Sequence, residues 1–258
     1  MKKVVQFEKN REAGLAILRI DRPEASNAVN TQVMEELADA LDCAREDADV
    51  RVVILTGTGE RSFVAGGDLK EFHSALTSEE IVYEKMSQMR RVLEQIVSFP
   101  KPVIAAVNGA ARGGGGEVAA ACHFRVASET ATVGYVQVKL GVSPGWGGGV
   151  LLERIVGRQK AMWLTLSGEV FGAEKGKEIG FFEEVLPAEN FLDHAQTFAK
   201  KLAANPTPSL QALLHRFQGE DHTALFAEME KESRLCAQLW MTPEHMETVS
   251  AFLNRNKG

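Results

Sequence analysis

The sequence predicts an α/β fold, with a strand-rich core over residues 1–200 and a helical region over residues 201–258. Two continuous apolar runs, at 52–55 and 103–107, are typical of strands buried on both faces of a parallel sheet. Stretches with apolar residues at helical spacing alternate with these runs, and every segment after Asn205 has a helical pattern. A chain of 258 residues fits one large domain, or one domain with a small appendage.

The first part of the chain is expected to begin with a hairpin and a helix. Residues 4–7 and 16–20 have the pattern of two strands, and Gly14 between them is consistent with the turn. Thr31 is expected to cap a helix that runs to about Glu46.

The middle of the chain is expected to contain a glycine-bearing loop and two further helices. The loop covers residues 57–69, and the first helix, over 78–97, ends before Pro100. The second helix begins in the glycine run 113–116 and carries Glu117. The remaining elements are short strands near 124–127, 132–135 and 183–186, and helices at about 147–156, 158–167, 172–178, 188–203, 209–217, 222–239 and 243–253.

Composition and charge exclude several classes of function. The net charge of −6 lacks the basic footprint of a nucleic-acid-binding protein. The three cysteines and six histidines show no metal-ligand spacing, so no metal site is expected. No apolar stretch is long enough to cross a membrane, and residues 1–10 lack the apolar core of a signal peptide. The expectation is a cytoplasmic enzyme.

The glycine run at 113–116 permits two interpretations. Gly114, Gly116 and Ala119 satisfy the dinucleotide fingerprint G-x-G-x-x-G/A, but residues 133–139 lack the acidic residue that would hold the ribose. The favoured interpretation is an oxyanion hole, because a glycine at a helix N-terminus leaves a bare N–H open to a ligand oxygen.

A second donor is expected from residues 63–69. Gly66 and Gly67 free the backbone there, and Asp68 can cap the following helix. Two preorganised N–H groups would stabilise the enolate oxygen of a thioester, since each such donor typically contributes about 3–4 kcal/mol in the transition state.

Four stretches in order carry a resemblance to a known family. They are Arg22-Pro23 with Asn27-Ala28, Ala65 to Leu69, Asn108-Gly109 with Gly113 to Glu117, and Gly141 with Pro144-Gly145 and Gly147-Gly148. Over nearly its whole length, the chain resembles the crotonase superfamily, the enoyl-CoA hydratase/isomerase family. The resemblance implies an acyl-CoA lyase with a spiral of ββα units and a helical C-terminal trimerisation region, assembled as a homotrimer or homohexamer.

The resemblance also implies site residues. The N–H groups of Gly67 and Gly114 would be the oxyanion donors, and Glu117 matches the first of the two hydratase glutamates. Coenzyme A would be part of the substrate, and no separate cofactor is implied. The residues implied to bind substrate or coenzyme A are Ser26, Ala28, Ala65, Gly66, Asp68, Leu69, Lys70, Gly113, Val136 and Gly145.

The match departs from the family at the second glutamate. The family's Pro-Glu pair falls on Val136 and Gln137, and glutamine cannot exchange a proton as a general acid or base. Hydration or isomerisation of an enoyl-CoA remains the first expectation, with Glu117 transferring the proton and Gln137 binding a water or a carboxylate.

Beyond hydration and isomerisation, two alternatives remain open and one is not expected. Residues 137–148 are similar to the ethylmalonyl-CoA decarboxylase branch, in which loss of CO2 from a malonyl-type thioester gives the enolate without a base. The dehalogenase branch carries a nucleophilic carboxylate where this chain has Gly145, so covalent carboxylate catalysis is not expected. A crotonase-fold protein that binds acyl-CoA without turnover is the second alternative that remains open.

Overall fold

The strands of the protein form two sheets. The computed structural model describes residues 2–219 and 221–255, and within them one sheet has six strands in the order β1-β2-β3-β5-β7-β10. The β1–β2 pair is antiparallel and the remaining neighbours are parallel, so the hairpin and the buried strands predicted from the sequence are confirmed. These strands are β1 (Val5–Asn10), β2 (Leu15–Ile20), β3 (Val52–Gly57), β5 (Val103–Val107), β7 (Phe124–Ser128) and β10 (Glu184–Leu186).

The second sheet has four short strands in the order β4-β6-β8-β9. They are β4 (Ser62–Val64), β6 (Ala110–Arg112), β8 (Thr132–Gly134) and β9 (Val170–Gly172). Of these, β8 was expected from the sequence. The expectation of an unbroken loop over 57–69 was wrong, because β4 lies within it. Strands β3, β5 and β7 of the large sheet are each followed by a strand of the small sheet, which produces the predicted ββα spiral.

The helices agree closely with the sequence periodicity. They are α1 (Thr31–Glu46), α2 (Leu69–Ala75), α3 (Glu79–Val97), α4 (Gly114–Ala121), α5 (Gly148–Val156), α6 (Arg158–Ser167), α7 (Ala173–Glu178), α8 (Phe191–Ala203), α9 (Thr207–Gln218), α10 (Thr223–Trp240) and α11 (Pro243–Arg255), with 3-10 turns η1 (Pro23–Ala25) and η2 (Val136–Leu140). One cap was assigned wrongly: the side chain of Asn30, not Thr31, accepts the hydrogen bond from the Val33 N–H.

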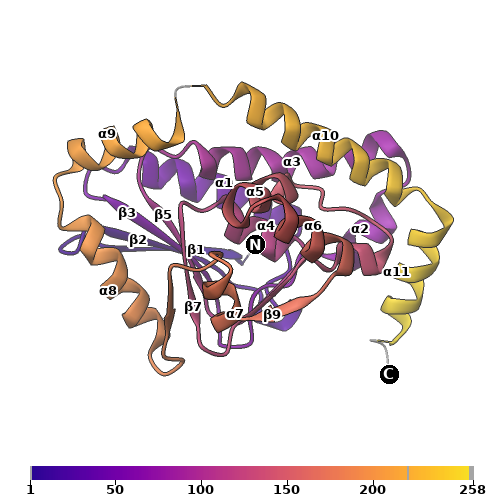
Figure 1. Ribbon diagram of the computed structural model, residues 1–258, viewed down its shortest axis with the longest axis horizontal. Coiled ribbons are helices and arrows are strands. Elements are labelled where there is room, and N and C mark those ends of the chain that lie inside the picture. Colours follow the sequence, from indigo (N-terminus) through magenta and orange to yellow (C-terminus); the bar gives the residue numbers. More distant parts are fainter. Residues whose placement is uncertain (1, 220, 256–258) are drawn as a thin grey trace.

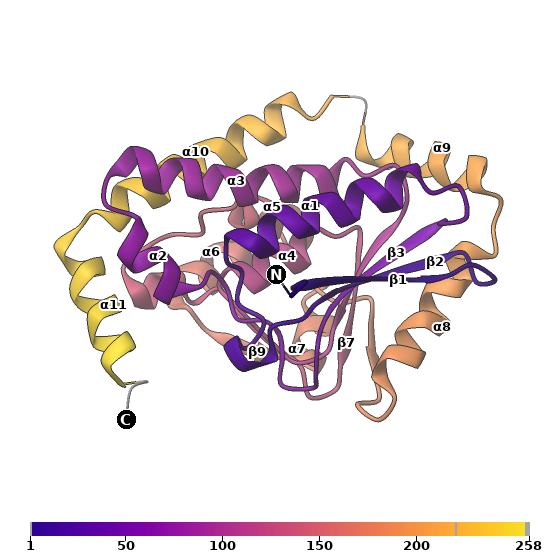
Figure 2. The ribbon, with the colours of Figure 1, turned by 180° about the vertical axis from the view of Figure 1, so that it is seen from behind.

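Helices cover the large sheet on both faces. On one face α1 and α3 pack together, and α10 runs along α3 (Figures 1 and 2). On the other face α8 packs its alanines against the apolar side chains of β2, β3 and β5. Helix α4 is buried throughout its length and lies at the centre of the molecule (Figure 1). Its N-terminus is therefore held rigidly where the functional site forms.

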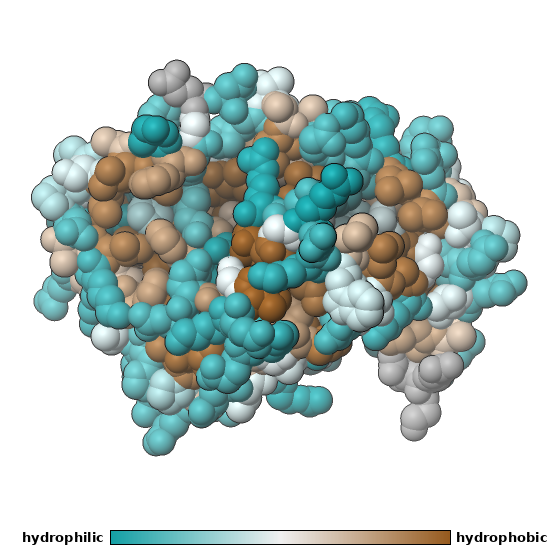
Figure 3. Space-filling view, in the orientation of Figure 1, coloured by the Kyte–Doolittle hydropathy of each residue, from teal (hydrophilic) through white to brown (hydrophobic). Residues whose placement is uncertain are grey.

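The region after α8 consists of α9, α10 and α11. The division at residue 200 and the assignment of this region to trimer formation stay predictions. The face seen in Figure 3 is largely hydrophilic, with hydrophobic residues gathered in several patches. Three of the exposed apolar side chains, Met162, Trp163 and Leu166, lie on α6. Among the described helices, none combines the length and the apolar composition that a membrane span requires.

Candidate functional site

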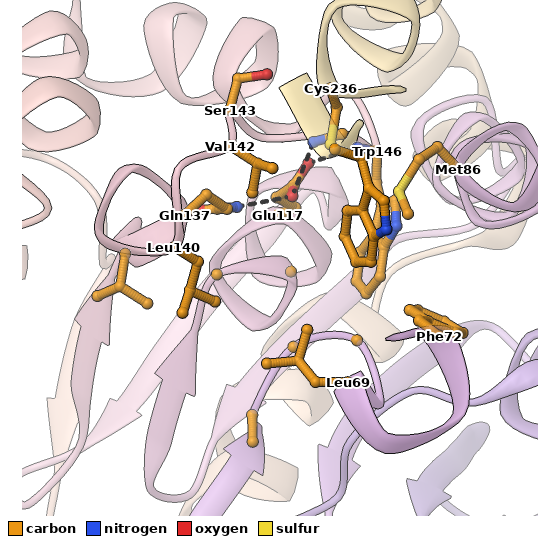
Figure 4. A pocket seen from close by; sticks show the side chains of 18 residues that line it. Leu69, Phe72, Met86, Glu117, Gln137, Leu140, Val142, Ser143, Trp146 and Cys236 are labelled. Atoms are coloured by element: carbon orange, nitrogen blue, oxygen red, sulfur yellow. Dashed lines mark hydrogen bonds between the residues drawn. The ribbon is translucent and has the colours of Figure 1, made fainter. Parts of the chain in front are cut away.

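A partly open pocket of about 100 Å³ lies at the N-terminus of α4. It brings together most of the site residues that the sequence predicted: Ala65, Gly66, Gly67, Leu69, Gly113, Gly114, Glu117, Val136, Gln137 and Gly145. The remaining walls are mostly apolar and come from α2, α3, η2, the turn before α5, and α10: Phe72, Met86, Leu140, Val142, Ser143, Trp146, Cys236 and Trp240 (Figure 4).

The N–H of Gly67 is aimed by a short parallel bridge to Val29. The Val29 N–H donates to the Gly66 carbonyl at 2.8 Å, and the Asp68 N–H donates to the Val29 carbonyl at 2.8 Å. In this parallel pair, Gly66 and Asp68 make the two hydrogen bonds to Val29. Gly67, which lies between them, points its own N–H away from Val29. The Gly67 N–H therefore faces away from Val29, on the side where the pocket lies.

The N–H of Gly114 is the first in α4, where backbone donors have no acceptor within the helix. The two donor segments are adjacent: a Cβ on Gly66 would lie 3.5 Å from the Gly114 nitrogen. Gly66 also has φ = +99°, which favours glycine. Within the described chain, neither the Gly67 N–H nor the Gly114 N–H donates a hydrogen bond. Both are thus available to a ligand oxygen.

The carboxylate of Glu117 is buried beside these donors and is held by the turn before α5. Its Oε2 accepts from the N–H groups of Trp146 at 2.8 Å and Gly148 at 2.9 Å. Its Oε1 accepts from Gln137 Nε2 at 2.9 Å and from the Gly145 N–H at 3.4 Å (Figure 4). The Gly145 contact exceeds the usual range of 2.7–3.2 Å, so Oε1 is the oxygen held less tightly.

Burial raises the pKa of Glu117, while hydrogen bonds from Gly148, Trp146, Gly145 and Gln137 oppose that rise. Desolvation is the largest of these effects, because the charged carboxyl loses water on every side. A carboxyl group with a raised pKa in a cleft is suited to proton exchange near neutral pH.

Two polar atoms in the pocket wall are buried without a partner in the described chain. They are Gln137 Oε1, an acceptor, and Trp240 Nε1, a donor. Since buried polar groups are almost always hydrogen-bonded, these atoms indicate where a bound molecule supplies the missing partners. Trp240 was not predicted as a site residue, because its spacing in α10 is that of an ordinary packing residue.

The indole ring of Trp146 forms the part of the pocket wall that lies next to Gly67 and Gly114. A Cβ on Gly114 would lie 2.0 Å from ring atom Cζ3, and one on Gly67 would lie 3.6 Å from Cζ2. The ring therefore packs directly on the Gly114 backbone, which only glycine permits there. Trp146 is 3% exposed and limits the space beside the donors.

Four of the predicted coenzyme A residues lie outside the wall of this pocket: Ser26, Ala28, Asp68 and Lys70. Asp68 caps α2, accepting from the N–H groups of Lys70 and Glu71. Arg22 links these segments, donating to the Ala28 carbonyl at 2.6 Å and to Asp68 Oδ2 at 2.9 Å. Ser26 and Lys70 are exposed. The roles of all four in binding coenzyme A stay predictions.

No group of three or more His, Cys, Asp or Glu side chains within 2–219 and 221–255 is arranged to hold a metal ion. The polar groups that line the pocket are backbone N–H groups, one carboxylate, two indoles, a serine, a thiol and one carboxamide. This set suits an anionic oxygen and a proton transfer.

Comparison with known proteins agrees with this chemistry. The family described as enoyl-CoA hydratase/isomerase matches residues 10–258. A probable enoyl-CoA hydratase of Bacillus subtilis is 35% identical over 94% of this chain and 93% of its own length. A short-chain-enoyl-CoA hydratase of Clostridium acetobutylicum is 33% identical over 96% and 94%. The crystal structure of an enoyl-CoA hydratase from Bacillus anthracis superposes with a TM-score of 0.80 at 32% identity, covering 98% of this chain and 96% of that one.

Proposed function

Since this chain belongs to the enoyl-CoA hydratase/isomerase family, we propose that it hydrates a short-chain enoyl-CoA through a thioester enolate. One observation carries the proposal. The N–H groups of Gly67 and Gly114 border one pocket and, within the described chain, have no other acceptor. An enolate oxygen between them would receive two hydrogen bonds at the moment when its negative charge develops.

Glu117 is the proposed proton-transfer group. A water that donates to Glu117 Oε1 and to the unpartnered Gln137 Oε1 would be positioned to attack C3 of the substrate. As the C3–O bond forms, the water proton passes to Glu117, the π pair of the C2=C3 double bond forms a C1=C2 double bond, and the π pair of the carbonyl moves onto the thioester oxygen. Glu117 then returns that proton to C2, so one water adds across the double bond.

The size of the pocket supports a short acyl chain. An apolar cavity of about 150 Å³ accommodates a benzene molecule, so about 100 Å³ holds roughly four carbon atoms. Crotonyl-CoA is the proposed test substrate for this reason. The reaction as proposed uses only water and the acyl-CoA, in which coenzyme A is part of the substrate, and calls for no separate cofactor.

The proposed assembly is a homotrimer or homohexamer. It is supported by the family and by the apolar side chains exposed on α6, at Met162, Trp163 and Leu166. Analytical ultracentrifugation tests this part of the proposal, and a monomer at all concentrations would reject it.

Absorbance of the conjugated thioester tests the proposed activity. It is expected to fall when purified protein is added to crotonyl-CoA in water, with 3-hydroxybutyryl-CoA as the product. Migration of the double bond without uptake of water would instead indicate isomerisation. Inertness toward enoyl-CoA thioesters, with tight acyl-CoA binding in calorimetry, would indicate a binding protein.

Decarboxylation of a malonyl-type CoA thioester is a second candidate. Among the described residues that line the pocket, Glu117 alone carries a carboxylate, and backbone donors already hold it. Loss of CO2 breaks the C–C bond without a base and leaves the same enolate for the Gly67 and Gly114 donors. Release of CO2 from methylmalonyl-CoA or ethylmalonyl-CoA, without hydration of crotonyl-CoA, would favour this candidate.

A further inference from the structure

The first turn of α5 lies between two carboxylates that come from distant parts of the chain. Glu117 on α4 accepts from the Gly148 N–H at 2.9 Å. Glu232 on α10 accepts from the next two donors, with Gly149 N–H to Oε1 at 3.1 Å and Val150 N–H to Oε2 at 3.0 Å. Successive N–H groups of one helix terminus are thus shared between the proposed proton-transfer residue and a second glutamate.

The glycines of this turn make room for both carboxylates. A Cβ on Gly148 would lie 2.2 Å from Cβ and Cγ of Glu117. A Cβ on Gly149 would lie 2.5 Å from Oε2 of Glu232. Any other residue at either position would push the corresponding carboxylate away from the helix terminus. Gly148 and Gly149 therefore have a local physical cause, which is the close approach of one glutamate to each of them.

Glu232 also borders a second cavity, of about 360 Å³, on the outer side of the turn. This cavity shares Ser143 with the acyl pocket. The turn before α5 consequently separates two spaces, with Glu117 facing the acyl pocket and Glu232 facing the outer cavity. The helix terminus between them carries partial positive charge, which both carboxylates share.

We propose that Glu232 is a positioning residue for the reaction at Glu117: it holds the first turn of α5, and its charge raises the pH at which Glu117 gains or loses its proton. This inference rests on the proposed function only in giving that proton a role in catalysis. The coupling between the two carboxylates is a property of the protein alone.

The electrostatics agree with this geometry. Burial, and then the charge of Glu117, raise the pKa of Glu232 to about 8, and burial raises the pKa of Glu117. Two such groups titrate as a pair rather than independently. Other ionisable groups near Glu232 belong to the surrounding elements: Tyr135 before η2, Glu153 on α5, Arg158 on α6 and Cys236 on α10 itself.

The sign of the expected shift follows from the charge. The repulsion between the two carboxylates is reciprocal: because the charge of Glu117 raises the pKa of Glu232, an ionised Glu232 raises the pKa of Glu117 by the same amount. Glu232→Gln removes that charge and lowers the pKa of Glu117. Since the proposed base is the ionised form of Glu117, the rising limb of kcat/KM against pH moves to lower pH in this variant. The expected shift is about one unit, the strength at which paired sites titrate together.

The experiment compares two readouts across a pH series. The first is kcat/KM for crotonyl-CoA in the wild type, Glu232→Gln and Glu232→Asp. Aspartate keeps a charge but withdraws it by one methylene group, so its midpoint is expected between the other two. Glu153→Gln is the matched control, because Glu153 is exposed, borders the same outer cavity and is expected to leave the midpoint unmoved.

The second readout is the infrared band of the protonated Glu117 carboxyl, identified by its loss in Glu117→Gln. The pH midpoint of this band is expected to move together with the rising limb of kcat/KM. The infrared measurement does not require the enzyme to turn over substrate. A band that moves in a protein inert toward crotonyl-CoA would reject the proposed hydratase and keep the coupling. Unmoved midpoints in folded Glu232→Gln, or in Glu232→Asp if the glutamine variant does not fold, would overturn the inference. A loss of kcat/KM in Glu232→Gln by the same factor at every pH would likewise overturn the inference, because Glu232 would then act only as a cap of α5.

Discussion

Replacing Trp146 with alanine is expected to lengthen the acyl chain that the pocket accepts. The indole ring packs on the Gly114 backbone and reaches toward Gly67, so it blocks the space next to both proposed oxyanion donors. Because the ring is almost completely buried, its removal opens the existing pocket rather than the outer surface.

The size of the effect follows from the volume. The pocket of about 100 Å³ holds roughly four carbon atoms, by comparison with cavities of about 150 Å³ that hold benzene. Loss of the indole is expected to admit roughly four further methylene groups after partial collapse of the walls. At about 0.8 kcal/mol for each buried methylene group, the transition state gains about 3 kcal/mol. That corresponds to roughly 200-fold in kcat/KM for a longer substrate.

The assay is the ratio of kcat/KM for 2-octenoyl-CoA to that for crotonyl-CoA. The ratio is expected to rise by up to roughly 200-fold in Trp146→Ala, and to stay at the wild-type value in Trp163→Ala. Trp163 is the matched control, because it is 64% exposed on α6 and lies outside the pocket. A correctly folded Trp146→Ala protein with an unchanged ratio would refute the assignment of the indole ring as the end of the acyl pocket.

Three further predictions concern Glu117, Asp68 and His123. Glu117→Gln is expected to lower kcat by about 10²–10⁴-fold, the usual share of a general acid–base group, and undiminished turnover would remove Glu117 from the mechanism. Asp68→Ala removes the α2 cap and the partner of Arg22, so urea denaturation should show a loss of at least about 1 kcal/mol, whereas Asp42→Ala at an exposed ion pair should lose much less. Burial lowers the pKa of His123 to about 4, so the unfolded chain binds a proton near pH 6 that the folded protein does not. Stability should therefore fall by up to about 3 kcal/mol as pH drops from about 6.5 to about 4, and a His123→Gln variant with an equally steep fall would contradict this cause.

The elements that the sequence predicted well are those with a long periodic pattern. The apolar stripe of α1 and the continuous run of β5 extend over enough residues to define their period. A strand of three residues is too short for its alternation to be recognised reliably: β8 and β10 were expected, whereas β4, β6 and β9, which have the same length, were missed. The small sheet depends instead on which segments the large sheet brings together, and that information is tertiary.

The site was predictable to the extent that it depends on backbone freedom. Gly66, Gly67 and Gly114 mark places where a side chain is excluded, and such positions are visible in a single sequence. The sequence also placed Glu117 one helical turn beyond Gly114. It did not reveal that the turn before α5 holds the Glu117 carboxylate, because that contact joins residues about thirty positions apart. Glu232 was missed for the same reason, since α10 reaches α5 only in the folded chain.

The turn before α5 links proton transfer and acyl selectivity through a single piece of backbone. The Trp146 N–H holds Glu117 Oε2, while the ring of the same residue closes the acyl pocket. A shift of this turn therefore moves the proposed base and the pocket wall together. A shift of the Gly66–Gly67 segment, which is anchored separately by Val29, moves an oxyanion donor alone. Changes confined to the Trp146 side chain should consequently alter chain-length preference with little effect on the pH profile, whereas changes to the turn backbone should alter both.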